Sequence, residues 1–523
     1  MTRTVPGRTD HVVVVGAGLA GLSAALHLLG TGRRVTLLER DAYPGGRAGR
    51  LDLDTERGTY RVDTGPTVLT MPDLLDEAFA AVGEKAADRL DLVELDPAYQ
   101  AHFADGSTMD VHTDAAAMEH EVRSVCGPAA AAGYVRMRDW LTRLYRAEID
   151  SFIGANLDSP LALLGPDLAR LAALGGFGRL GPRVARMLPD ERLQRIFSFQ
   201  ALYAGVPPHR ALAAYGVIAY MDTIGGVFFP RGGMRQVGQA LADAATDAGA
   251  EIHYGRAATG LERRGGRVTA VRHTSAGAAA ADGGDTVRLE CDAVVLTPDL
   301  PIVHRLLGRA PRRAFPLRYS PSAVVLHAGV ARARPELAHH TISFGAAWRR
   351  TFREIVDEGR LMSDPSLLVT RPTATDPTLA PPGSDLLFVL APCPNLDRGP
   401  IDWARVGPAY RDELLGVLES RGHPGLGTLT GDLGDVEVSR LVTPADWAAE
   451  GMAAGTPFSA AHTVAQTGPF RPRNLVRGLL NAVVAGCGTT PGVGIPPVLI
   501  SGRLAAERIT GASTRARRVP AAL

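Results

Sequence analysis

Lysine is almost absent from this chain of 523 residues, since Lys85 is the one lysine among 56 basic residues. A single lysine leaves one candidate for Schiff-base chemistry, which argues against a pyridoxal enzyme. The 56 basic residues are balanced by 55 acidic ones. Because the net charge is close to zero, the chain has no large field to attract nucleic acid or an acidic substrate. We therefore expect no nucleic-acid partner.

Cysteine is also scarce. Cys126, Cys291, Cys393 and Cys487 lie far apart, without a CxxC pair and without histidines at metal-ligand spacing. This pattern argues against a disulfide scaffold and against a structural zinc site. We expect no metal site.

The sequence has no apolar run of the ~18–20 residues that a membrane-spanning helix needs. Arg3 and Arg8 precede an apolar stretch from Val12 onward, an order that a signal peptide also shows. We reject that interpretation because the same stretch begins the glycine motif described next. Any membrane contact is therefore expected to be peripheral.

The first motif that carries chemistry lies near the amino terminus. The β-branched run Val12–Val15 predicts a buried parallel strand, and a helix-compatible segment ends at about Leu29. Between them stand Gly16, Ala17, Gly18, Leu19, Ala20 and Gly21. The first glycine allows a tight turn, the second lets the backbone approach a pyrophosphate, and the third allows close packing of helix on strand. The motif predicts a dinucleotide site.

An acid in register with these glycines supports that interpretation. Residues 34–38 predict the second strand, and Glu39 follows it, eighteen residues beyond Gly21. A carboxylate at this place accepts hydrogen bonds from a ribose diol and repels a 2′-phosphate. The fingerprint serves both NAD and FAD, so the choice depends on the residues that follow.

Those residues form a second glycine-rich turn, with Arg40 at its start and Gly46 and Arg47 at its centre. The turn resembles the extended FAD motif of the amine oxidase and carotenoid desaturase superfamily. The resemblance implies FAD, with Arg40, Gly46 and Arg47 in the cofactor site and the last two along the pyrophosphate and ribityl chain. It also implies that the return segment with Gly65, Pro66 and Thr67 lines the isoalloxazine, and that Ala258 lies near the adenine.

A second stretch of similarity lies near the carboxyl terminus. Residues 478–498 predict a buried strand, a glycine-rich loop and a helix whose amino end can face an electron-rich group. The stretch is similar to the terminal motif of the bacterial phytoene desaturases, and with residues 230–233 the resemblance covers essentially the whole chain. It implies FAD contacts from Gly486, Gly494, Ile495 and Pro496.

Two departures from the family pattern leave the catalytic residues unassigned. Many members carry a histidine at the place of Thr490, and amine oxidases usually carry an acid at the place of Cys487.

Asp222 precedes the Pro-Arg-Gly-Gly block at residues 230–233, and we interpret it as a solvated or capping aspartate. Phe199, Tyr203 and Tyr215 are candidates for the wall of an apolar tunnel.

The predicted fold class is α/β. We expect a discontinuous Rossmann-like FAD-binding domain from residues 10–90, 226–300 and 472–515. An α+β substrate domain is expected from residues 91–114 and 301–471, with a helical subdomain from residues 115–225. The segment 161–188 mixes apolar residues with Arg170, Arg179, Arg183 and Arg186, which suits a membrane headgroup interface.

The resemblance implies FAD-dependent desaturation of a carotenoid precursor, phytoene to lycopene or a related polyene, by hydride transfer to the flavin. It implies a cytoplasmic protein bound peripherally at the inner face of the cell membrane. Because no second GxGxxG motif is present, we expect a quinone or oxygen as the electron acceptor. The alternatives are a desaturase of a later carotenoid, a polyene isomerase or saturase, an amine oxidase, and a non-enzymatic isoprenoid-binding chaperone.

Overall fold

The computed structural model describes the whole chain except residues 1–2, 277–285, 312, 314, 423–434 and 514–523. Its first sheet is parallel and has the strand order β19-β13-β1-β2-β9. The strands are β1 (His11–Val15), β2 (Arg34–Leu38), β9 (Glu251–His253), β13 (Ala293–Leu296) and β19 (Ala482–Val484). Val12, Val13 and Val14 are fully buried, as expected for a strand covered on both faces. This sheet confirms the predicted α/β class with a Rossmann-like core.

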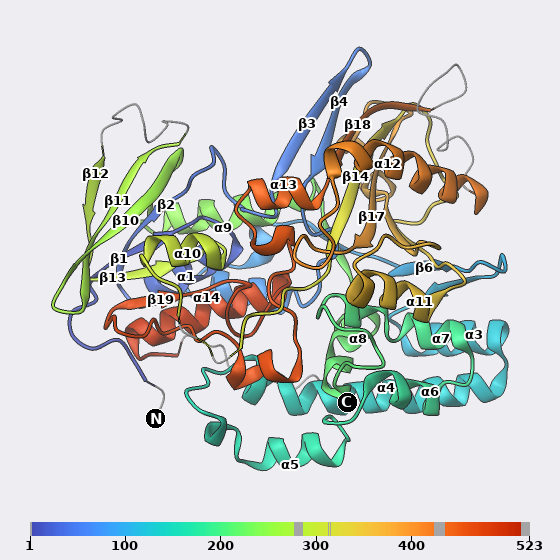
Figure 1. Cartoon of the computed structure of the whole chain (residues 1–523), viewed down its shortest axis with the longest axis horizontal. Coiled ribbons are helices and arrows are strands. Elements are labelled where there is room, and N and C mark those ends of the chain that lie inside the picture. The colour runs from blue at the N-terminus through green and yellow to red at the C-terminus, as the bar shows by residue number, and fades with distance from the viewer. Residues whose placement is uncertain (1–2, 277–285, 312, 314, 423–434, 514–523) are drawn as a thin grey trace.

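Three helices from distant parts of the sequence pack together beside this sheet (Figure 1). They are α1 (Leu19–Leu29), α9 (Arg235–Asp247) and α14 (Ile495–Thr510). The α1 and α14 backbones approach so closely that a Cβ on Gly502 would lie 2.4 Å from the Ala20 carbonyl oxygen. The segment after residue 472 thus completes the layer that the first thirty residues begin.

A three-stranded antiparallel sheet covers the other side of the parallel sheet. It consists of β10 (Arg256–Arg264), β11 (Arg267–Ser275) and β12 (Val287–Glu290), with α10 (Leu300–Leu306) beside it. Val303 and Leu306 of α10 share an apolar cluster with Val13 and Val294 of the parallel sheet. α10 therefore buries its apolar face against the parallel sheet, although it begins next to residue 301, where we expect the substrate domain to resume.

The second large sheet has the order β18-β14-β17-β16-β15-β6-β7. Its strands are β6 (Tyr99–His102), β7 (Thr108–Val111), β14 (Ser322–Val330), β15 (His340–Ser343), β16 (Leu367–Thr370), β17 (Asp385–Cys393) and β18 (Val436–Val442). Asp105 and Gly106 lie in the turn between β6 and β7. The strand β5 (Leu92–Glu94) pairs with β8 (Phe228–Pro230) and not with this sheet.

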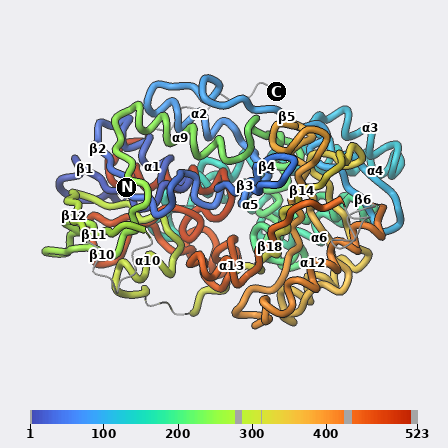
Figure 2. Tube along the Cα trace, turned by 90° about the horizontal axis from the view of Figure 1, so that it is seen from above, coloured from blue at the N-terminus to red at the C-terminus, as the bar shows by residue number. Residues whose placement is uncertain are grey.

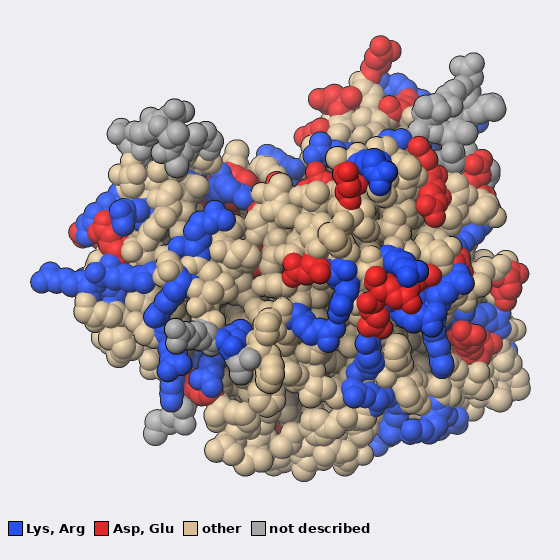
Figure 3. Space-filling view, in the orientation of Figure 1, with Lys and Arg blue, Asp and Glu red and all other residues tan. Residues whose placement is uncertain are grey.

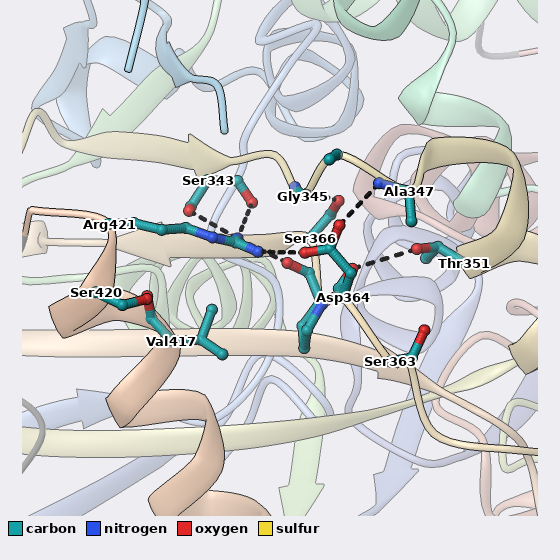
Figure 4. Close-up of polar contacts among 12 residues, drawn as sticks. Ser343, Gly345, Ala347, Thr351, Ser363, Asp364, Ser366, Val417, Ser420 and Arg421 are labelled. Atoms are coloured by element: carbon teal, nitrogen blue, oxygen red, sulfur yellow. Dashed lines mark hydrogen bonds and ion pairs between the residues drawn. The ribbon is translucent and has the colours of Figure 1, made fainter. Parts of the chain in front are cut away.

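One side of this sheet is covered by α12 (Trp403–Ser420), and α11 (Trp348–Arg353) follows β15. Directly after α12, the Arg421 guanidinium donates to Asp364 Oδ1 at 2.8 Å and to the Pro365 carbonyl at 2.7 Å (Figure 4). Asp364 Oδ2 also accepts from the Ala347 amide at 2.8 Å. One ion pair therefore ties the end of α12 to the loops before α11 and β16.

The remaining elements include a hairpin and the predicted helical region (Figures 1 and 2). The hairpin is β3 (Arg50–Thr55) with β4 (Gly58–Asp63). The helices are α2 (Asp73–Ala80), α3 (Ala115–Cys126), α4 (Pro128–Glu148), α5 (Pro166–Ala173), α6 (Leu180–Met187), α7 (Glu191–Ile196), α8 (Gly216–Thr223) and α13 (Pro444–Ala449). Among the described residues, no helix combines the length and apolarity needed to cross a bilayer.

Candidate functional site

A single cavity of about 1450 Å³ runs between the parallel sheet, the seven-stranded sheet and the helical region. Most of the residues that the sequence assigned to the cofactor line its wall. These are Gly16, Gly18, Leu19, Ala20, Glu39, Arg40, Gly46, Arg47, Gly65, Pro66, Thr67, Ala258, Gly486, Gly494, Ile495 and Pro496. The residues come from five separated stretches of the chain, which the fold brings to one surface. Ala17 and Gly21 are not part of the lining.

The first glycine turn has no room for side chains. Gly16 has φ +102°, and a Cβ there would lie 2.4 Å from Thr297 Oγ1. A Cβ on Gly21 would lie 2.0 Å from the Gly16 carbonyl oxygen. Gly21 therefore lies behind the cavity wall, where the absence of a side chain lets α1 pack against the turn.

Glu39 reaches the same turn from the end of β2. Its carboxylate accepts from the Ala17 amide at 2.6 Å and from the Asp41 amide at 2.9 Å. Burial raises the pKa of Glu39 despite these two hydrogen bonds. Arg40 lines the same cavity and forms an exposed ion pair with Glu450 at 2.8 Å.

The second glycine turn packs directly on the first. The Gly45 amide donates to the Ala17 carbonyl at 2.9 Å, and a Cβ on Gly46 would lie 3.0 Å from Gly18 Cα. From the far side, α9 presses on this turn, because a Cβ on Gly238 would lie 2.6 Å from Gly45 Cα. Sequence reasoning missed Gly238, since a lone glycine in a helical pattern does not reveal which backbone it faces.

Arg47 links this turn to two more strands of the parallel sheet. Its guanidinium donates to Asp299 Oδ2 at 3.0 Å, after β13, and to the Cys487 sulfur, after β19. Asp299 and Cys487 are buried and also line the cavity. Asp299 was missed by sequence reasoning, although its place at the carboxyl end of a parallel strand is where ligand-binding residues gather.

The rest of the cavity is an apolar channel. One wall is formed by Val217, Ile218 and Met221 of α8, and the opposite wall by residues of β14 and β17 such as Val325 and Leu390. Tyr203 and Tyr215 line it, as predicted, whereas Phe199 stands behind and contacts Tyr203 edge-on at 5.9 Å. The channel reaches the surface near Leu163, Phe177, Val464 and Phe470.

Asp222 corrects an expectation, since it is neither solvated nor a helix cap. It lies at the end of α8, is 3% exposed and lines the channel. Its Oδ2 makes no hydrogen bond of ordinary geometry within the described residues, nor do the buried hydroxyls of Tyr99 and Tyr203 nearby. Burial raises the pKa of Asp222 to about 7. The interior of the channel thus contains a carboxyl group whose pKa lies close to neutral pH.

A second polar group lies beside the carboxyl-terminal glycine loop. His462 Nδ1 is 3.0 Å from Tyr215 Oη, and Tyr215 Oη is hydrogen-bonded to Thr467 Oγ1. The His462 ring fills the space beside Gly492, where a Cβ would lie 2.5 Å from the imidazole Cε1. Burial and the nearby Arg471 guanidinium hold the pKa of His462 well below its usual value. The imidazole is therefore neutral.

Arg471 holds the carboxyl-terminal glycine loop through hydrogen bonds to its backbone. Its buried guanidinium donates to the carbonyls of Thr489 and Cys487 at 2.9 Å and of Ala460 at 3.2 Å. It thus joins the segment that carries His462 to the loop before α14. Neither His462 nor Arg471 belongs to a sequence motif that we had recognised.

Comparisons with known proteins agree with this geometry. The model of the family "Flavin containing amine oxidoreductase" matches residues 19–510. A phytoene dehydrogenase of Streptomyces griseus is 66% identical over 510 residues, which cover 97% of this chain and 96% of that protein. A zeta-carotene-forming phytoene desaturase of Myxococcus xanthus is 36% identical and covers 97% and 95%.

Solved structures share the fold at low sequence identity. A putrescine oxidase bound to putrescine has a TM-score of 0.59 at 15% identity and covers 97% of this chain and 100% of its own. An oxidoreductase from Methanosarcina mazei has a TM-score of 0.58 at 16% identity and covers 94% and 98%. The resemblance to bacterial phytoene desaturases is confirmed, FAD is the cofactor, and the chain belongs to the family of flavin-containing amine oxidoreductases.

Proposed function

We propose that the protein desaturates a long carotenoid precursor, most simply phytoene to lycopene, with FAD as the hydride acceptor. The observation that carries this proposal is the continuity of the cavity. One end is a glycine-lined cradle for a dinucleotide, and the other is an apolar channel that opens among exposed apolar side chains. A polar amine substrate would not need such a channel.

The residues at the cradle fit FAD. Gly16 and Gly18 line the cavity without side chains, so a pyrophosphate could approach their backbone, and the amide groups at the start of α1 supply donors for it. Glu39 would accept from the adenosine ribose, and Ala258 would lie by the adenine. Gly46 and Arg47 would follow the pyrophosphate and ribityl chain, and the loops with Thr67 and Gly494 would enclose the isoalloxazine. When bound, FAD supplies a two-electron acceptor for a hydride.

The apolar wall of the channel positions the substrate and excludes water. A hydrocarbon offers no group that ionises, so the protein must hold the reacting carbons beside the flavin and keep water away. Side chains of α8 on one side and of β14 and β17 on the other line the channel in which the substrate would lie. Orientation of this kind can lower a barrier by up to ~7–11 kcal/mol.

The mouth of the channel suits a lipid surface. Leu161, Leu164 and Phe177 are 73%, 68% and 54% exposed. In Figure 3 the lower edge of the molecule, where α5 lies in Figure 1, is mostly uncharged, with Lys and Arg side chains on both sides. Exposed apolar groups flanked by cations suit a headgroup interface. A substrate dissolved in the bilayer would enter here, and a quinone dissolved there could reoxidise the flavin; oxygen is the alternative acceptor.

The test is to incubate purified protein and FAD with phytoene in liposomes and follow the visible spectrum. New absorbance bands at successively longer wavelength support the desaturase, and their position gives the number of double bonds formed. A protein that binds FAD but leaves the spectrum flat would contradict the phytoene assignment. Repeating the assay with a partly desaturated carotenoid, under air or with a quinone in the absence of air, then tests the later-carotenoid alternative and the acceptor. A protein that cannot be loaded with FAD would contradict the whole proposal and favour an isoprenoid-binding chaperone.

A further inference from the structure

We propose that His462 is the base that removes the proton in this reaction, with Tyr215 and Thr467 as its positioning partners and proton outlet. The inference rests on the proposed desaturation. His462 lines the cavity and packs against Gly492, in the same loop that contributes Gly494 and Ile495 to the flavin end. It therefore stands where the apolar channel meets the cradle.

The reaction needs a proton acceptor at this place. One C–H bond of the substrate breaks with its electron pair, and the hydride passes to the oxidised flavin, which is reduced by two electrons. In the same step the neighbouring carbon loses a proton, and the electron pair of that second C–H bond becomes the new C=C bond. The proton forms a bond to the lone pair on His462 Nε2. Charge and atoms balance, with flavin as the oxidant.

The geometry leaves Nε2 available for this role. Nδ1 is occupied by Tyr215 Oη at 3.0 Å, and the ring also contacts the Tyr215 ring edge-on with centroids 5.4 Å apart. Within the described part of the chain, the hydrogen bond of the ring is made through Nδ1, and Nε2 faces the backbone of Gly492, where a Cβ would lie 2.6 Å from it. An imidazole oriented through one nitrogen and free at the other is the usual arrangement of a general base.

Two carboxyl groups, of Glu148 and Asp222, also line the channel. Burial raises the pKa of Glu148 well above its usual value, and that of Asp222 to about 7. Glu148 is therefore already protonated, and Asp222 is partly so at neutral pH. The neutral imidazole of His462 is available over the whole physiological range.

A path also exists for the proton to leave. The hydrogen bonds run from His462 to Tyr215 and on to Thr467. Thr467 is partly exposed, between Val464 and Phe470, which are each 53% exposed at the mouth. The nearby Arg471 cation disfavours a lasting imidazolium, so that Nδ1 passes its proton to Tyr215; the ring then holds the substrate proton on Nε2 and must release it before the next turnover.

The test uses the FAD-loaded protein mixed with phytoene vesicles without oxygen, and follows flavin bleaching in a stopped-flow instrument. We expect His462→Gln and His462→Ala to bind FAD as wild type does and to bleach at least about 100-fold more slowly, the low end for general-base catalysis. The glutamine keeps a hydrogen bond to Tyr215 but cannot act as a base. Added imidazole should restore part of the rate of His462→Ala, and Tyr215→Phe should show a smaller loss.

The outcomes separate this inference from the proposed function. If wild type itself is not bleached by phytoene, the proposed function fails. If wild type bleaches and His462→Gln bleaches within threefold of it, His462 has only a structural role and the inference is overturned. His120→Ala, an exposed histidine of α3 outside the cavity, is the matched control and should leave the rate unchanged.

Discussion

The guanidinium of Arg47 lies 3.0 Å from the carboxylate of Asp299, and this ion pair joins the second glycine turn to the carboxyl end of β13. Asp299 also accepts from the Ala453 amide at 3.2 Å and caps α10 through the Leu300 amide at 2.8 Å. The cavity wall thus holds an acid next to Cys487, where the acid of the amine oxidases is missing. We infer that Asp299 positions Arg47 toward the cofactor.

Asp299→Asn should therefore weaken FAD binding. Asparagine keeps the size and can still accept from Leu300, but it leaves the partly buried Arg47 without its counter-charge. A lost hydrogen bond to a charged group costs roughly 1.5–3 kcal/mol, which corresponds to about a 10- to 100-fold higher dissociation constant. A fluorescence titration of the apoprotein with FAD measures this dissociation constant. An unchanged constant would restrict Asp299 to capping α10.

Glu39→Arg should reduce the flavin content of the purified protein. The substitution removes the acceptor for the Ala17 and Asp41 amides and places a cation beside the expected adenosine ribose. We expect at least a tenfold loss of FAD affinity, and a smaller one for Glu39→Gln, which can keep one of the two backbone contacts. Flavin absorbance per mole of protein gives the answer. Wild-type flavin content in Glu39→Arg would refute the assignment.

Gly238→Ala tests a residue that does not face the cavity. In a helix interior alanine is favoured over glycine by ~1 kcal/mol. At this site the added methyl would overlap the backbone of Gly45. We expect the second glycine turn to shift, with lower thermal stability and weaker FAD binding than wild type. Gly416→Ala in α12, where a Cβ meets nothing within 4 Å, is the matched control and should be neutral or stabilising.

Asp222→Asn should change how stability depends on pH. The folded-state pKa of about 7 lies above the ordinary 3.8, so the folded protein holds a proton that the unfolded chain has released. The contribution of Asp222 to stability is therefore full below pH ~4 and is lost as pH rises through about 7. Relative to Asp222→Asn, wild type should lose about 2 kcal/mol between pH 5 and pH 8 in urea unfolding. Parallel stability curves for wild type and Asp222→Asn would show that folding does not raise the pKa of Asp222.

The exposed apolar side chains near the mouth should control vesicle binding. Replacing Leu161, Leu164 and Phe177 with serine removes groups whose burial is worth up to ~1.5–3 kcal/mol each. We expect at least a tenfold weaker association with anionic liposomes in a sedimentation assay, with FAD content unchanged. Val287→Ser, on β12 away from the mouth, is the control. Equal sedimentation of both variants would remove the basis of the membrane proposal.

Residues with a strong local signal could be assigned from the sequence. The strand at Val12–Val15, the turn at Gly16 and the acid at Glu39 stand close together in the chain, and their spacing alone indicates a dinucleotide site. Asp222, Asp299 and His462 could not be assigned in this way. Their meaning depends on contacts between segments far apart in the sequence, such as Arg47 with Asp299, and His462 with Tyr215.

The layer completed by α14 has a consequence for how the enzyme is made. The amino-terminal strand and the first glycine turn leave the ribosome early, but β19 and α14 are among the last elements to be synthesised. Until they dock, β13 lacks a neighbour and α1 lacks its main packing partner. A nascent chain therefore carries an incomplete cradle until β19 and α14 have been made, and we expect FAD to bind only after they dock.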